Sequence, residues 1–205
     1  GIVGQGKGYG GFHFGGADQE ENIFGGRGRA RRSREGEDVL AKVDVTFEEA
    51  ALGADKEISF RSPDGSQQSL KVHIPAGIDS GQKIRLRGKG MPGQNGGQAG
   101  NMLLEVTVQS KPGFERKGTD LYTTVEIPFE TAVLGGEAIV PTLTGKVSCK
   151  IKEGTQSGTK IRLKGKGIVS MKNPSRKGDE YAVIQIHVPK HLTPAAKQKL
   201  TEYAK

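Results

Sequence analysis

The stretch VDVTFEEAALG at Val43–Gly53 is repeated as VEIPFETAVLG at Val125–Gly135. Further along the chain, GQKIRLRGKG at Gly81–Gly90 is matched by GTKIRLKGKG at Gly158–Gly167. A third pair of similar segments follows in each half, again in the same order and at a nearly constant spacing. This self-similarity indicates an internal duplication and predicts two domains of one architecture.

The duplication divides the 205 residues into four parts. Residues 1–36 are rich in Gly and Phe, and we expect a flexible linker because so few apolar side chains cannot offset the entropy of ordering this backbone. Residues 37–111 and 112–190 hold the two copies. In residues 191–205, Thr193 is a suitable N-cap and Pro194 a suitable first helical residue, which predicts a C-terminal helix.

Each copy has the pattern of strands rather than of long helices. Apolar residues alternate with polar ones over 39–45 and 70–74, the period of a half-buried strand. Thr46 and Glu49 fit the capping box of one short helix, and Pro128 starts the equivalent helix in the second copy. We therefore predict a mainly β protein: two tandem, internally duplicated β-sandwich-like domains, each with a short helix, plus a C-terminal helix.

Composition argues against several classes of protein. The single cysteine, Cys149, excludes a disulfide framework and a zinc site made of several thiolates, and it suits a reducing cytoplasm. No apolar run approaches the length of a membrane span. Gly88–Gly93 imitates a nucleotide loop, but Pro92 forbids the helix that such a loop requires.

The sequence also offers no catalytic constellation. No Ser or Cys nucleophile lies near a plausible base, and no carboxylate pair is credible. The four histidines include His187 and His191 at helical spacing, but Pro189 lies between them. We therefore predict a protein that is not an enzyme and that has no metal site and no cofactor.

Basic residues follow a regular pattern in both copies, and the net charge of the chain is +8. Four cations recur at every second position in each repeat: Lys83, Arg85, Arg87 and Lys89, and then Lys160, Arg162, Lys164 and Lys166. On a strand, this spacing places all four charges on one face. That face is either a solvated outer surface or a binding site for an anionic partner, which is either a phosphate backbone such as that of DNA or an acidic peptide.

The segment IPAGIDSGQKIRLRGKGMPGQNGG at Ile74–Gly97, together with the FEEAALG box, resembles the C-terminal region of the J-protein co-chaperones, the DnaJ family. Gly1–Gly26 resembles the Gly/Phe-rich linker that follows the J domain in that family. The His-Pro-Asp signature of the J domain is absent from these residues. Ser62–Ser66 stands where the classical members insert a cysteine-rich zinc module. The chain is therefore similar to the zinc-less subclass, which includes the curved-DNA-binding relatives.

The resemblance implies that residues 37–111 bind unfolded polypeptides and hand them to a DnaK-type chaperone. It also implies that residues 191–205 join two chains into a homodimer. The family's groove lies between the first strand and the strand after the short helix. It maps here to Ala41 and Val43 on one side and to Ile58 and Phe60 on the other, with Lys56 at the rim. From the pattern alone, the four apolar residues are better explained as core residues of alternating strands. The resemblance reverses this preference for Ile58 and Phe60 only. The alternative function is that of a basic, nucleoid-associated DNA-binding protein.

Overall fold

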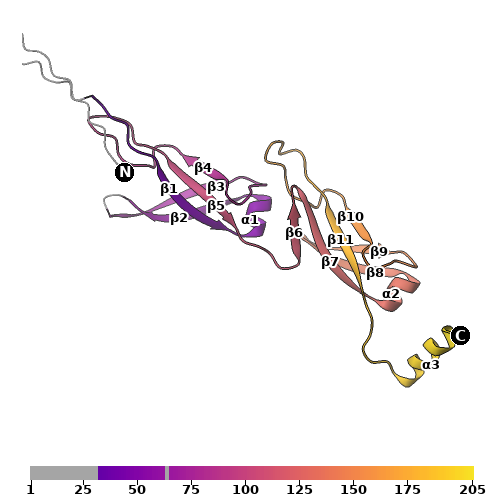
Figure 1. Cartoon of the computed structure of the whole chain (residues 1–205). Coiled ribbons are helices and arrows are strands. Elements are labelled where there is room, and N and C mark those ends of the chain that lie inside the picture. Colours follow the sequence, from indigo (N-terminus) through magenta and orange to yellow (C-terminus); the bar gives the residue numbers. More distant parts are fainter. Residues whose placement is uncertain (1–31, 63–64) are drawn as a thin grey trace, which may run out of the picture. The chain divides into compact units, whose positions relative to one another are not determined.

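The computed structural model describes residues 32–62 and 65–205, and Figure 1 shows β-rich segments followed by a last helix. The first repeat contains β1 (Val39–Val45), α1 (Phe47–Leu52), β2 (Ala54–Arg61), β3 (Gln67–Ile74), β4 (Lys83–Leu86) and β5 (Met102–Val108). The second repeat contains β6 (Phe114–Lys117), β7 (Asp120–Pro128), α2 (Phe129–Leu134), β8 (Gly136–Thr142), β9 (Gly145–Ile151), β10 (Lys160–Leu163) and β11 (Glu180–His187). The last helix is α3 (Pro194–Tyr203). The predicted mainly β fold is confirmed, whereas most of the predicted linker, residues 1–31, lies outside the described residues.

The two repeats share one topology. In the first, the sheet order is β1-β5-β4, with β1 parallel to β5, and β2 pairs with β3 in a separate antiparallel sheet. In the second, β7 is likewise parallel to β11, β10 pairs with β11, and β8 pairs with β9. Both sheets of the first repeat contribute to one apolar core. Seven of its side chains are at most 1% exposed: Val45, Ala50, Val72, Ile74, Ile78, Leu104 and Val106.

The duplication extends to individual hydrogen bonds. Asp38, just before β1, accepts a bond from the backbone N–H of Asn101 at 2.6 Å. Asp120, at the start of β7, accepts the equivalent bond from the N–H of Asp179 at 2.8 Å. An aspartate thus ties the start of β1 to the start of β5 in the first repeat, and the start of β7 to the start of β11 in the second.

One strand breaks the symmetry between the repeats. β6 pairs antiparallel with β7, so the larger sheet of the second repeat has the order β10-β11-β7-β6. In the described part of the first repeat, no strand takes the corresponding place beside β1. Residues 33–38 run instead along the loop after β4, where Arg34 N donates to Gln94 O and Gly36 N donates to Gln98 O. The edge of β1 that faces away from β5 is therefore open in this part of the chain.

Glycines make the contact between residues 33–38 and that loop sterically feasible. A Cβ atom on Gly36 would lie 1.8 Å from Met91 O, and one on Gly97 would lie 1.9 Å from Arg34 O. Backbone approaches this close exclude any side chain. The Gly-rich sequence that follows β4 therefore serves backbone packing.

The short helices begin where the sequence predicts. The Thr46 hydroxyl accepts from Glu49 N, and the Glu49 carboxylate accepts from Thr46 N, which confirms the capping box of α1. Pro128 is the N-cap of α2. The Thr193 hydroxyl accepts from Ala196 N and caps α3.

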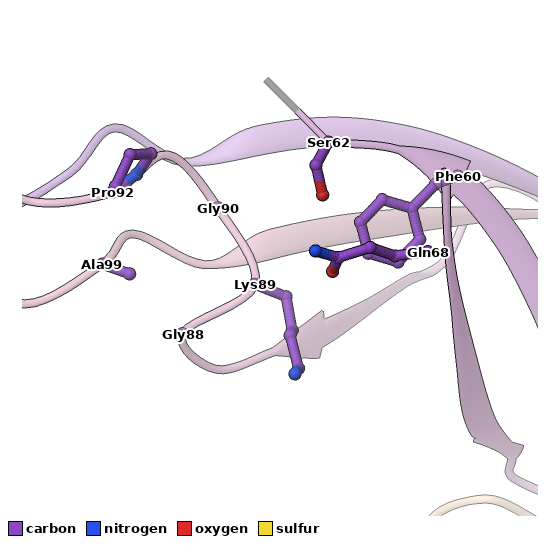
Figure 2. Close-up of a pocket in the computed structure, with 8 residues that line it drawn as sticks. All are labelled: Phe60, Ser62, Gln68, Gly88, Lys89, Gly90, Pro92 and Ala99. Carbon is purple, nitrogen blue, oxygen red and sulfur yellow. The ribbon is translucent and has the colours of Figure 1, made fainter. Parts of the chain in front are cut away.

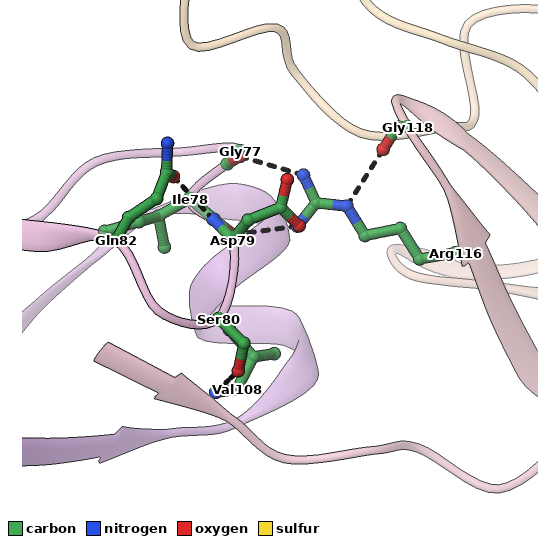
Figure 3. Close-up of polar contacts among 8 residues, drawn as sticks. All are labelled: Gly77, Ile78, Asp79, Ser80, Gln82, Val108, Arg116 and Gly118. Carbon is green, nitrogen blue, oxygen red and sulfur yellow. Dashed lines mark hydrogen bonds and ion pairs between the residues drawn. The ribbon is translucent and has the colours of Figure 1, made fainter. Parts of the chain in front are cut away.

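Arg116 of β6 joins the two repeats, as Figure 3 shows. Its guanidinium donates to the carbonyl oxygens of Ile78 at 2.7 Å and Gly77 at 2.9 Å, both in the first repeat. It also donates to Gly118 O at 2.9 Å and forms an ion pair with Asp79 at 3.0 Å. Because the Arg116 side chain is only 15% exposed, these bonds lie in a largely desolvated place.

Candidate functional site

Strands β1 and β2 contribute the apolar residues of the predicted groove. Val43 on β1 is only 7% exposed and belongs to the core of the first repeat. Ala41 on β1 and Ile58 on β2 are half-buried and pack against the same cluster. The structure thus brings these three predicted residues together, with Ala41 and Ile58 still partly accessible to a ligand.

Phe60, further along β2, lies at a cavity of about 300 Å³. It is half-buried, and its cross-strand partner is Gln68 of β3. Figure 2 shows the residues that line the cavity: Phe60, Ser62, Gln68, Gly88, Lys89, Gly90, Pro92 and Ala99. The sequence did not predict that the loop after β4 would form one side of this cavity, because that contact joins segments distant along the chain.

Lys56, predicted at the rim of the groove, is bonded within the protein. Its ammonium group donates to Asp44 O at 2.7 Å and to the Glu49 carboxylate at 3.0 Å. The bonds from Thr46 N and from Lys56 lower the pKa of Glu49. Lys56 therefore ties β2 to the end of β1 and to the start of α1.

The equivalent positions of the second repeat are closed. Thr123 and Val125 take the places of Ala41 and Val43, and Val140 takes that of Ile58. All three are at most 6% exposed. β6 also covers the strand edge that is open on β1. Among the described residues, a free strand edge beside half-buried apolar side chains is therefore a feature of the first repeat.

The two basic series differ in their surroundings, and the strands that carry them are shorter than predicted. Lys83 and Arg85 lie on β4 and Lys160 and Arg162 lie on β10, whereas Arg87, Lys89, Lys164 and Lys166 lie in the turns that follow. The sequence Arg-Gly-Lys-Gly ends the strand because Gly88 adopts a φ of +69°. The prediction that one strand face carries four cations is therefore wrong, because each strand carries only two of them.

Arg162 forms an ion pair, which distinguishes the second series from the first among the described residues. The Arg162 guanidinium lies 2.6 Å from the Asp179 carboxylate. The backbone N–H of Gly165 and the Arg162 side chain together lower the pKa of Asp179. By contrast, no residue within 32–62 or 65–205 forms an ion pair with the cations of the first series, from Lys83 to Lys89.

A second apolar surface lies between α2, the segment after β11 and α3. It surrounds a cavity of about 830 Å³ lined mainly by Phe129, Leu134, Val188, Leu192, Leu200 and Tyr203. Tyr203 is 82% exposed and Leu134 is 74% exposed. In the first repeat, the counterpart of Phe129 is Phe47, which is 8% exposed and packs against Leu121 and Ile168 of the second repeat. The same helix face is therefore buried in α1 and exposed in α2.

The described residues contain no cluster of three or more His, Cys, Asp or Glu side chains with the geometry to hold a metal ion. Cys149 is half-buried in β9, and burial raises the pKa of its thiol. None of the helices in the described ranges is long and apolar enough to cross a membrane.

Comparison with known proteins gives one consistent family. The family model of the DnaJ C terminal domain matches residues 39–189. A chaperone protein DnaJ from Macrococcus caseolyticus is 33% identical over 276 positions, which cover 98% of this chain and 74% of that protein. A chaperone protein DnaJ from Lachnospira eligens is 44% identical over 140 residues, or 68% of this chain and 37% of that protein.

A relative with a different name is also similar. The curved DNA-binding protein of Pseudomonas syringae pv. tomato is 39% identical over 200 positions, which cover 89% of this chain and 63% of that protein. The chain thus corresponds to only part of the length of these relatives. The members of this family are co-chaperones in protein folding rather than enzymes, in agreement with the sequence prediction. From the matched domain and its relatives, we conclude that the chain belongs to the DnaJ family, through its C-terminal domain.

Proposed function

We propose that the groove between β1 and β2 binds extended segments of unfolded polypeptides and that the protein delivers them to a DnaK-type chaperone in the cytoplasm. The observation that carries the proposal is the contrast between the repeats. Ala41 and Ile58 are half-buried beside an open strand edge, whereas Thr123 and Val140 are buried. A shallow apolar floor beside a free strand edge suits an extended peptide, which supplies both backbone partners and side chains.

The proposal predicts that Phe60→Ser abolishes most of the chain's ability to suppress aggregation of a denatured protein. Phe60 lines the cavity but belongs to neither apolar core, so its loss removes binding surface with little cost to folding. Ile58→Asp is the stronger variant, because it places a charge on the groove floor. Light scattering of a heat-denatured client measures the effect.

Ile139→Asp is the matched control, since Ile139 lies on the strand equivalent to β2 but is 58% exposed. It should protect the client as well as the parent chain does. Circular dichroism would verify that each variant is folded. A folded Phe60→Ser variant with full activity would contradict the proposal.

We further propose that the apolar surface of α2 and α3 binds a second copy of the chain. The face of α1 that corresponds to this surface is buried by another β-repeat, so the face of α2 is shaped for the same kind of cover. Leu200 and Tyr203 of α3 are exposed beside it, and a ten-residue helix is marginal in water without a partner. A second copy supplies an equal α3 to fill this surface by two-fold exchange.

This dimer should be lost when Leu200 is replaced by aspartate, because the charge would be buried in the apolar contact. Light scattering should then show a monomer at concentrations where the parent chain is a dimer. Gln198→Asp changes a residue on the same helix that does not line the cavity, and it should leave the dimer intact. A parent chain that stays monomeric at high concentration would refute the dimer.

DNA is the second candidate ligand, and it is favoured by the first basic series, whose cations form no ion pair with the described part of the chain. If Lys83 and Arg85 contact phosphates, affinity for duplex DNA should fall steeply as salt rises. For each neutralised phosphate, the logarithm of the binding constant should fall by about 0.9 per tenfold rise in salt concentration. Replacing both by glutamine should flatten this slope, whereas replacing Lys160 and the paired Arg162 should change it less. No shift of duplex DNA at low salt would remove this candidate.

A further inference from the structure

We propose that ionisation of Glu180 loosens the junction between the two repeats, so that the repeats are held together more tightly in mild acid than at neutral pH. The part of the chain that moves is residues 166–169, in the loop after β10. The proton on one buried carboxyl thus sets how firmly the first repeat is attached to the second.

Glu180 lies on the buried face of the larger sheet of the second repeat. On β11 it is placed between Leu121 of β7 and Leu163 of β10, and residues in one row across a sheet share a face. Leu121 packs in a cluster with Phe47 of α1 and with Ile168, whereas Leu163 belongs to the core of the second repeat. The carboxyl of Glu180 therefore lies where this core meets the contact with the first repeat.

A negative charge on this carboxyl is poorly compensated. Glu180 is 0% exposed, and neither of its oxygens has a hydrogen-bond partner within residues 32–62 or 65–205. Burial and, to a smaller extent, Glu180 raise the pKa of the Cys149 thiol on β9, so this thiol is neutral and supplies no charge. Burial raises the pKa of Glu180 to about 7 although the charge of Lys166 opposes it. The ionised form is therefore costly unless water reaches the carboxylate.

Other charged groups on the neighbouring elements do not compensate Glu180. Asp120 and Arg162 alternate with the buried residues of their strands, so they point to the opposite face of the sheet. The charged side chains of that face, of β6 and of α1 form ion pairs of their own: Arg162 with Asp179, Arg116 with Asp79, Lys111 with Glu48, and Lys56 with Glu49.

Residues 166–169 are the part of the surroundings that moves at least cost. They lie outside the strands, whereas β7, β10 and β11 are held in one sheet. Ile168 N donates to Thr119 O at 2.7 Å, and Gly178 N donates to Ile168 O at 3.0 Å. Loops held by few bonds open more readily than the strands of a core. Displacing Ile168 would uncover Leu121 and admit water to the carboxyl beside it.

The same segment contacts the first repeat. A Cβ atom on Gly77 would lie 2.0 Å from Val169 O, so the backbones of the two repeats touch there. Gly77 O also accepts from the Arg116 guanidinium at 2.9 Å (Figure 3). A movement of residues 166–169 that admits water to Glu180 therefore removes part of the contact between the repeats.

Amide hydrogen exchange of the full chain, followed by NMR, tests the proposal. After correction for the intrinsic exchange rate, the protection of the Ile168 and Gly178 amides should fall roughly a hundredfold between about pH 5 and pH 8. The fall follows from a pKa of 4.5 in the opened form and about 7 in the closed form. Glu180→Gln is neutral at every pH, so its protection should stay constant over this range.

Lys166→Gln should shift the upper end of this transition to higher pH, because it leaves the burial of Glu180 without the opposing charge of Lys166. Lys164→Gln is the matched control, since it removes an equal charge two residues earlier. It should leave the transition at the pH of the parent chain.

Arg116→Met links the opening to the junction. By weakening the contact with Gly77 and Ile78, it should lower the protection of Ile168 about tenfold or more at every pH. Unchanged protection in this variant would show that the loop opens without loosening the junction, and the proposal would fail. A pH response that persists in Glu180→Gln would also overturn it. So would equal protection of Ile168 and of Ile184, whose N–H donates to Thr159 O within the core sheet, because the whole repeat would then be unfolding.

Discussion

Replacing Glu180 by methionine is expected to raise the free energy of unfolding by about 3 kcal/mol at pH values near 8. The Glu180 side chain is fully buried, and neither carboxylate oxygen has a hydrogen-bond partner among residues 32–62 and 65–205. Burial raises its pKa from 4.5 to about 7, against a smaller opposing effect of Lys166. Met102 occupies the equivalent position of the first repeat at 2% exposure, so the fold accepts methionine there.

The expected gain depends on pH in a defined direction. Below about pH 4.5, Glu180 is protonated in both the folded and the unfolded chain, and the parent loses nothing. As the pH rises from 4.5 to about 7, Glu180 loses its proton in the unfolded chain but retains it in the folded chain. The free energy of unfolding of the parent protein therefore falls over this range. Above that range the loss is complete. Urea denaturation of both proteins at about pH 5 and pH 8 measures the difference, and a difference independent of pH would contradict this account.

Replacing Arg116 by methionine is expected to lower the free energy of unfolding by about 3 kcal/mol. The substitution leaves the carbonyl oxygens of Gly77 and Ile78 without the guanidinium that donates to them. The exposed Asp79 contributes little, because an ion pair in contact with water is weak. Because Arg116 forms polar contacts between the repeats, its loss should also separate their thermal unfolding transitions in calorimetry.

Lys117→Met provides the matched control for Arg116. Lys117 is the next residue of β6, its side chain is 59% exposed, and its ion pair with Glu115 is long at 3.7 Å. Its replacement should change stability by less than about 0.5 kcal/mol. Equal effects of the two substitutions would show that the contact of Arg116 with the first repeat adds no stability.

Local features of this fold could be predicted from the sequence. The duplication follows from repeated segments, and the caps at Thr46 and Thr193 follow from side-chain chemistry within three residues. The alternation over 39–45 correctly places Val43 and Val45 inside the sheet. Each of these signals is local, or is repeated along the chain.

Contacts between distant segments could not be predicted in the same way. The pairing of β6 with β7 and the course of residues 33–38 along the loop after β4 decide which groove is open, and no local pattern distinguishes them. The bonds of Lys56 to Asp44 and Glu49 were missed for this reason. Glu180 did leave a signal, because it stands at an inward strand position where the first repeat has Met102. The roles of the groove residues and of the basic series stay predictions.

The most direct test of the central claim is an NMR measurement of the chain, labelled on its methyl groups, as an unfolded client peptide is added. The account predicts intermolecular contacts from the peptide to the methyl groups of Ala41, Ile58 and Met91, on the open side of the first repeat. The exposed methyl groups of Ile139 should keep their positions in the spectrum. Contacts confined to Val133, Leu134 and Leu200, with Ala41 and Ile58 unchanged, would contradict it.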